Sequence, residues 1–179
     1  MIRAAKKTDS KKAIALLGDA AGHFIYKMSG YDDKDKALAV LEEFFCKENN
    51  RLSYQNVFVY EQNNIVIGAI CIYDGAKAES LDELLNLHLH KLGKENLLKE
   101  CEDEYYLDTI AVDIEARGQG IAKKLIEFAT KEAQNKGKKL SLIVEYDNTI
   151  AKALYHKLGF KFVKIKDFHG HKYEYMIRK

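Results

Sequence analysis

Arginine and two glycines stand where a strand-like stretch of the chain passes into a helix-like one. The stretch reads DTIAVDIEARGQGIAKKLIEFA over residues 108–129, with Arg117, Gly118 and Gly120 at the junction. At the start of a helix, several backbone N–H groups lack a helical partner and point outward with the positive end of the helix dipole. Glycines let the backbone bend tightly and let a phosphate approach without a Cβ in the way. The junction is therefore suited to bind an anion.

The junction alone does not specify a ligand, because short R-G-x-G strings also form simple turns. It is not a P-loop, since no G-K-S/T closes it, and it lacks the third glycine of a dinucleotide-binding fingerprint. Ala122 keeps the next helical turn small, and Arg117 adds a fixed positive charge at the mouth. A phosphate site and a plain turn both stay open on these residues.

A second group of polar and small side chains lies in NTIAKALYHKLGF, residues 148–160. Asn148 and Tyr155 are seven residues apart, so two helical turns bring them onto one stripe, with Ala151 between them. We expect Leu154 and Leu158 to hold this helix against the core. A tyrosine on such a stripe is either a half-buried aromatic or a polar group available for chemistry.

The histidines and cysteines do not predict a metal site. His88 and His90 are two apart on a predicted helix and point about 200° away from each other, while His169 and His171 flank a predicted turn. The three cysteines are far apart and lack C-x-x-C spacing, so we expect reduced, structural cysteines.

The elements that must position these groups alternate helices with strands. A first strand over MIRAA is followed by two predicted helices, a hairpin around residues 62–64 and another helix, in which Ser80 and Glu83 have capping-box spacing. A strand, a helix, a second strand, a second helix and a final hairpin around residues 169–170 complete the order. We therefore predict an α/β layered domain with a mixed sheet.

Length and composition predict one globular domain over residues 1–179. Hydrophobic residues make up 47% of the chain and charged residues 31%, which suits a soluble domain. The longest apolar run, over residues 65–73, is much shorter than the roughly 20 residues that a membrane-spanning helix needs. Because no signal-peptide pattern is present, we expect a cytoplasmic protein without a membrane partner.

Charge is unevenly spread although the formal net charge is +2. Residues 79–115 hold eleven acidic and three basic side chains, and residues 116–179 hold fifteen basic and six acidic ones. A basic part can receive phosphates and an acidic part can attract an amine, although solvated helix faces also explain either block. No arginine-rich stripe with interleaved aromatics is present, so we expect no nucleic-acid partner.

The two motifs together resemble those of the GNAT acyltransferase superfamily. The family motif Q/R-x-x-G-x-G/A is matched by Arg117, Gly120 and Ala122. The later signature N-x-x-A-x-x-L-Y-x-K-L-G-F is matched by Asn148, Ala151, Leu154, Tyr155, Lys157, Leu158, Gly159 and Phe160. The resemblance covers most of the chain. It implies a mixed, mostly antiparallel central sheet flanked by helices, with two parallel strands, LDTIAV and SLIVE, splayed to form an acyl-CoA slot.

The resemblance also implies acetyl-CoA as the cosubstrate and no metal. The pyrophosphate would lie on the junction residues, namely Arg117, Gly118, Gln119, Gly120, Ile121 and Ala122. The pantetheine arm would bind Ile110 and Val112 like an added strand. Asn148 matches the polar residue near the pantetheine, and the N–H at Val112 or its neighbour would polarise the thioester carbonyl.

The implied reaction is direct transfer of an acetyl group to the primary amine of a small molecule or peptide, without a covalent enzyme intermediate. Tyr155 matches the family's tyrosine that protonates or stabilises the departing CoA thiolate. Asp108, four residues before Val112, occupies the position where several relatives carry a carboxylate that takes the amine proton through water. Glu104 is the second choice of base, and a purely structural role for Asp108 at the strand edge stays open.

The acceptor itself is not specified by the sequence. The acidic run over residues 100–104, with Tyr105 and Tyr106, can form an entrance for a cationic acceptor, and Tyr26, Tyr31 and Asp32 are candidate lining residues. A non-catalytic acyl-CoA sensor of the same fold and a structural interaction domain are the alternatives to an enzyme. A monomer and a homodimer are both compatible with the resemblance.

Overall fold

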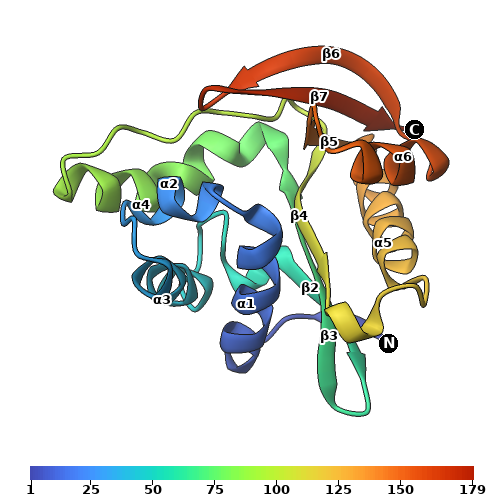
Figure 1. Cartoon of the computed structure of the whole chain (residues 1–179), viewed down its shortest axis with the longest axis horizontal. Helices are drawn as coiled ribbons and strands as arrows, with labels where there is room; N and C mark the ends of the chain where they lie inside the picture. Colours follow the sequence, from blue (N-terminus) through green and yellow to red (C-terminus); the bar gives the residue numbers. More distant parts are fainter.

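The computed structural model describes residues 1–179, and its seven-stranded sheet lies between two layers of helices (Figure 1). The strands are β1 (Ile2–Ala4), β2 (Val57–Gln62), β3 (Ile65–Asp74), β4 (Tyr105–Val112), β5 (Leu140–Glu145), β6 (Lys161–Phe168) and β7 (His171–Arg178). The helices are α1 (Ser10–Ala21), α2 (Phe24–Ser29), α3 (Lys34–Phe45), α4 (Ala78–Lys91), α5 (Ile121–Asn135) and α6 (Thr149–Lys157). None of the helices is long and apolar enough to span a membrane.

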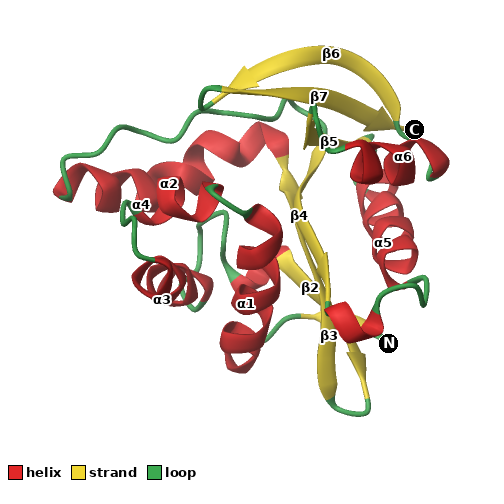
Figure 2. Cartoon of the chain, viewed as in Figure 1, coloured by secondary structure: helices red, strands yellow, loops and turns green.

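The sheet is mixed and mostly antiparallel, as predicted. Its strand order is β1-β2-β3-β4-β5-β7-β6, and β4 with β5 is the parallel pair. Helices α1 to α4 cover one face of the sheet, while α5 and α6 cover the other (Figure 2). The α/β layered architecture predicted from the alternating elements is therefore confirmed.

The region before the main hairpin contains three helices, where the sequence predicted two. The additional helix, α2, has six residues and is followed by Gly30, whose φ of 77° lies in the left-handed region. Six residues are too few for an apolar pattern to repeat, so periodicity does not reveal such a helix. Its Ile25 and Met28 side chains are nevertheless buried, and tertiary packing holds it in place.

Helix α4 begins earlier than the capping-box spacing predicted. It starts at Ala78, and the Ser80 hydroxyl donates to the carbonyl of Lys77 at 2.8 Å, so Ser80 does not cap it. The chain enters α4 through a short 3-10 turn. The Asp74 carboxylate caps this turn by accepting a hydrogen bond from the Ala76 N–H at 3.0 Å. The prediction of the helix is confirmed, and that of its first residue is wrong.

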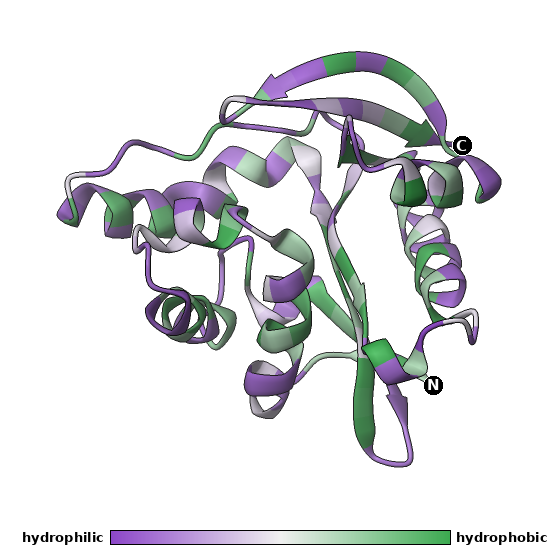
Figure 3. Ribbon diagram, viewed as in Figure 1, coloured by the Kyte–Doolittle hydropathy of each residue, from purple (hydrophilic) through white to green (hydrophobic).

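Two separate apolar cores hold the helical layers to the sheet. The larger one contains 22 buried residues, drawn mainly from α1 to α4 and one face of β2 to β4. The smaller one contains 14 buried residues, drawn mainly from α5, β3, β4 and β5. Strand β3 is strongly apolar (Figure 3). This composition suits its position, because the middle of the strand is covered on both faces. Helix α6 contributes no fully buried residue.

The parallel strands β4 and β5 separate soon after they meet. Only Tyr105 with Leu140 and Tyr106 with Ser141 are paired across them. Beyond these pairs the two strands diverge, while β3 continues to pair with the other edge of β4 as far as Val112 (Figure 1). The edge of β4 from Leu107 to Val112 that faces β5 therefore has no strand partner, which confirms the expected splay.

A buried arginine joins four segments of the chain beside β4. Arg51, with only 1% of its side chain exposed, lies in the loop after α3. Its guanidinium Nη2 is 2.8 Å from Oδ2 of Asp108 on β4, and its Nη1 is 3.4 Å from Oδ1 of Asp82 on α4. It also pairs with Glu100 in the loop before β4. The charge of one side chain thus ties α4, the loop before β4 and β4 itself together.

Replacing Arg51 with methionine should strongly destabilise the fold. The change leaves buried carboxylates without their counter-charge, which typically costs about 3–5 kcal/mol when one partner of a buried pair is removed. Equilibrium urea unfolding at neutral pH measures this loss.

Lys47→Met is the matched control, because Lys47 pairs with Glu43 at the exposed surface, where such pairs contribute little. Equal stabilities for Arg51→Met and Lys47→Met would contradict a structural role for the buried network.

Candidate active site

The glycine junction places a row of free backbone amides at the start of α5. Gly118 and Gly120 have φ values of 78° and 75°, in the left-handed region that side chains rarely adopt. A Cβ at either position would meet nothing within 4 Å, so the requirement for glycine is conformational. The N–H groups of residues 118–120 donate to no protein acceptor, and those of the first turn of α5 have no helical partner. The amides are therefore free for an anion.

Side chains around the junction divide into those that face solvent and those that face the core. Arg117 lies at the junction and its Nε donates to the carbonyl of Val112 at 3.3 Å, which ties the end of β4 to the junction. Gln119 is exposed. Ile121 is 3% exposed and belongs to the smaller core, so only its backbone can contact a ligand.

Two adjoining cavities run from this junction into the protein. The first, which we call the junction cavity, has a volume of about 640 Å³, and its lining includes Ile110, Val112, Arg117, Ala122 and Tyr155. The second, the inner cavity, has a volume of about 280 Å³, and its lining includes His23, Glu100, Tyr106, Asp108, Asn148 and Tyr155. Ala20, Ile110 and Tyr155 line both. The unpaired edge of β4 thus lies along one path from the glycines to the buried carboxylates.

Tyr155 stands where the two cavities meet. It projects from α6, and its ring packs edge-on against Phe160 with 5.6 Å between ring centroids. Burial raises the pKa of Tyr155 to about 12. The phenol therefore keeps its proton at neutral pH and is available as a hydrogen-bond donor.

Helix α6 turns its predicted polar stripe toward the cavities. Asn148 caps the helix, since its Oδ1 accepts from the Ala151 N–H at 3.1 Å, and both residues line the inner cavity. Leu154 was expected to hold α6 to the core, but it is 38% exposed and lines the junction cavity. Leu158 does pack against the smaller core, as expected.

Asp108 lines the inner cavity with both carboxylate oxygens engaged. Its Oδ2 accepts from Arg51 Nη2 at 2.8 Å and Nε at 3.1 Å, and from the Tyr73 hydroxyl at 3.1 Å. Its Oδ1 accepts from the Thr109 hydroxyl at 2.9 Å. These donors fix the carboxylate in place.

The acidic run before β4 does not act as one surface. Glu104, the second candidate base, accepts from the Tyr175 hydroxyl at 2.6 Å and lines neither cavity. Glu102 pairs with Lys164 at 2.9 Å at the surface. Of the run and its two tyrosines, Glu100 and Tyr106 line the inner cavity.

Glu100 lines the inner cavity, and the sequence offered it only as one member of this run. Its side chain is 4% exposed, and burial raises its pKa to about 7, with the charge of Asp108 adding to the rise and Arg51 opposing it. No sequence signal singles out Glu100 or Arg51, because the loops that carry them meet only in the folded chain. Near neutral pH, Glu100 is therefore closer to its protonated form than an ordinary glutamate.

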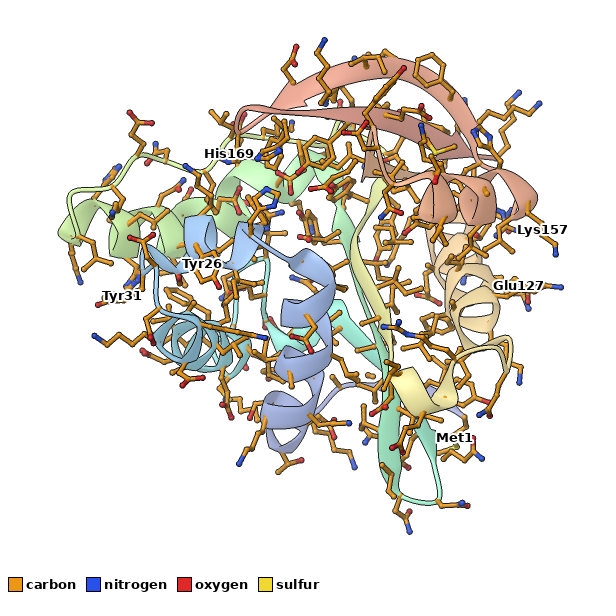
Figure 4. All side chains as sticks on the ribbon, in the orientation of Figure 1. Met1, Tyr26, Tyr31, Glu127, Lys157 and His169 are labelled. Atoms are coloured by element: carbon orange, nitrogen blue, oxygen red, sulfur yellow. The ribbon has the colours of Figure 1, made fainter.

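The three residues expected to line the acceptor site lie outside both cavities. Tyr26, Tyr31 and Asp32 line neither cavity, and Figure 4 shows Tyr26 on α2 and Tyr31 near α3, away from the centre of the sheet. The inner cavity is instead lined by residues 20–24, where α1 passes into α2. This segment carried no motif that could mark it from sequence.

Comparisons with known proteins agree with this geometry. The family model described as Acetyltransferase (GNAT) family matches residues 21–160. A Haemophilus ducreyi protein named [Ribosomal protein bS18]-alanine N-acetyltransferase is 32% identical over 119 residues, which span 66% of this chain and 63% of that protein. The crystal structure of an N-acetyltransferase from Staphylococcus aureus Mu50 is 30% identical, covers 99% of both chains and superposes with a TM-score of 0.83.

A third comparison supports the fold alone. The crystal structure of the ribosomal-protein-S18-alanine N-acetyltransferase from Escherichia coli is 20% identical, with 99% of this chain and 92% of that one covered and a TM-score of 0.60.

The family model spans well over half of the chain, and it includes both the glycine junction and the Tyr155 helix. The chain therefore belongs to the GNAT acetyltransferase family.

Proposed function

We propose that the protein transfers an acetyl group from acetyl-CoA to the primary amine of a peptide or small molecule. The observation that carries this proposal is the position of Tyr155 between the free amides of the junction and the buried carboxylates of the inner cavity. The Haemophilus ducreyi relative is named for an alanine of a ribosomal protein, which favours a peptide amine as the acceptor. Because Glu100 and Asp108 line the inner cavity, a cationic acceptor suits it.

The junction residues suit the phosphates of acetyl-CoA. We assign the pyrophosphate to the amides of Gln119, Gly120, Ile121 and Ala122, with Arg117 and Gly118 beside them. The unpaired edge of β4 at Ile110 and Val112 offers backbone groups to the pantetheine arm, as a sheet edge does to an added strand. Asn148 lies further in, where its amide NH₂ is available to the same arm.

The transfer forms a C–N bond to the acceptor amine and breaks the C–S bond of the thioester. The amine gives up one proton, directly or through water, and Glu100 is best suited to take it near neutral pH, with Asp108 held beside it by Arg51. The backbone N–H at Val112 or its neighbour on the unpaired edge of β4 polarises the carbonyl. Tyr155 donates a proton or a hydrogen bond to the departing sulfur.

A non-catalytic sensor would use the same junction and bind acyl-CoA without turnover. The inner cavity favours the enzyme, because a sensor has no need of a tyrosine and a titratable carboxyl beside the thioester end of the path. Thiol release distinguishes the two functions. We expect release that depends on an added amine, whereas CoA binding without release from any pooled amine, amino acid or peptide would establish the sensor.

Tyr155→Phe should lower kcat by about 10²-fold while leaving the KM for acetyl-CoA nearly unchanged, since only the hydroxyl that serves the leaving sulfur is lost. Steady-state thiol release with the best acceptor measures both parameters. Tyr146→Phe is the control, because Tyr146 is 50% exposed and lines neither cavity. Equal rates for the two variants would rule out an acid role for Tyr155.

Glu100 should give transfer a pH dependence near neutrality. A base must be unprotonated to accept a proton, so kcat/KM should rise as the pH increases through about 7, where Glu100 loses its proton. An ordinary glutamate would place this rise near pH 4.5. Glu100→Gln should remove this inflection and lower the plateau. The control, Glu102→Gln, changes an exposed carboxylate two residues away and should keep it. An unchanged inflection in Glu100→Gln would assign the titration to another group.

Arg117→Gln should weaken CoA binding by about tenfold, because a hydrogen bond to a charged group is lost, and the difference should shrink as salt is raised. Isothermal titration calorimetry with CoA at two salt concentrations measures the effect. Lys123→Gln is the control, since Lys123 is also in the first turn of α5 but pairs with Glu127 and lines neither cavity. A larger loss of CoA affinity in Lys123→Gln would show that the pyrophosphate binds near Lys123 and not near Arg117.

A further inference from the structure

Three side chains with metal-binding atoms meet at the rim of the inner cavity. His23 lies between α1 and α2, Glu145 ends β5, and His171 begins β7. One ligand atom from each lies within 4.8 Å of the others. His23 and Glu145 also line the inner cavity, so this group borders the space that holds Asp108 and Tyr155.

The spacing of the three side chains is close to that of a metal site. Nδ1 of His23 is 3.7 Å from Oε1 of Glu145, and the rings of His23 and His171 are stacked with centroids 4.3 Å apart. A zinc ion binds nitrogen and oxygen ligands at about 2.0–2.2 Å, so two ligands of a tetrahedral ion lie roughly 3.3 Å from each other. Rotation about the side-chain bonds is needed to close the ligand atoms from within 4.8 Å to that spacing and to turn the two stacked rings so that a nitrogen of each faces the same point.

The chemistry of the group also fits such an ion. Two imidazoles and one carboxylate form a ligand set that proteins use for zinc, with the remaining position left to water. The same set binds other divalent metals of the first transition row. All three residues are exposed, so an ion reaches them from solvent.

We propose that His23, Glu145 and His171 bind one divalent transition-metal ion, with Zn²⁺ as the expected species. Neither histidine pair weighed from the sequence forms this group. Nε2 of His88 lies 2.8 Å from the Ser29 carbonyl, and of His169 and His171 only His171 belongs to the group, while His169 packs against Phe168. Here the ligands come from three segments that only the fold brings together.

A bound ion would place positive charge at the rim of the inner cavity, where a cationic acceptor would pass on its way to Asp108. The passage of a cationic acceptor past this charge rests on the proposed function, whereas the metal binding does not. Binding is therefore measured on the protein without acetyl-CoA or acceptor, so that a failure of the proposed transfer leaves the test of the metal site intact.

The test uses the full chain, purified without a histidine tag and freed of metal by a chelator. Calorimetric titration with Zn²⁺ should give one ion per chain, and titration with Co²⁺ should produce the visible absorption band of a four-coordinate site. His23→Ala, His171→Ala and Glu145→Gln should each weaken Zn²⁺ binding by at least about tenfold. Because these residues are exposed, circular dichroism should show all three variants folded.

His90→Ala is the matched control, because His90 is an exposed histidine of α4 outside the group. It should bind Zn²⁺ as the unaltered chain does. Absence of a one-to-one site in the unaltered chain would overturn the proposal. Equal weakening by His90→Ala and His171→Ala would also overturn it, because the ion would then bind histidines without regard to this cluster.

Discussion

The early parting of β4 from β5 is the constraint on which the site depends. Two residue pairs join these parallel strands, and then the polar edge of β4 from Leu107 to Val112 faces the gap without a partner. Backbone groups in such a position must find another partner, which is water or an extended ligand. The same gap gives rise to the two cavities that share Ile110 and Tyr155. A sheet paired along its whole length would leave no path between the glycines and the carboxylates.

The Arg51 network fixes the inner end of this path. Three carboxylates surround one guanidinium, so the group carries more negative than positive charge when all three are ionised. Burial then raises the pKa of Glu100 to about 7, while Asp108 is held by four hydrogen bonds. One buried guanidinium therefore anchors loops to the sheet and holds both Glu100 and Asp108 at the inner cavity.

The polar groups along the path are placed there mainly by the ends of helices and strands. The start of α5 provides free amides at one end, and α6 begins at Asn148 and carries Tyr155 to the middle. The passage from α1 to α2 closes the far side, and there His23 meets Glu145 and His171. Helix ends and loops can serve in this way because the sheet and its two cores hold them in fixed positions.

The sequence by itself determined the groups whose role follows from local geometry. Gly118 and Gly120 have the left-handed φ values that a tight turn requires, and Asn148 and Tyr155 lie on one stripe because helical periodicity places them there. The mostly antiparallel sheet and the splay of β4 from β5 were implied by the family resemblance that the two motifs carry. The short helix α2 and the start of α4 escaped prediction, since neither leaves a repeating pattern.

Only the tertiary structure decided which charged residues face the cavities. Glu100, Glu102 and Glu104 look alike in sequence, yet the first is buried beside Arg51, the second pairs with Lys164 and the third binds Tyr175. Their partners are between 49 and 71 residues away along the chain. Such contacts depend on how loops pack against the sheet, and no local spacing encodes that packing. The sequence thus specified the glycine junction with its free amides and the tyrosine, and the fold selected the carboxylates that line the inner cavity.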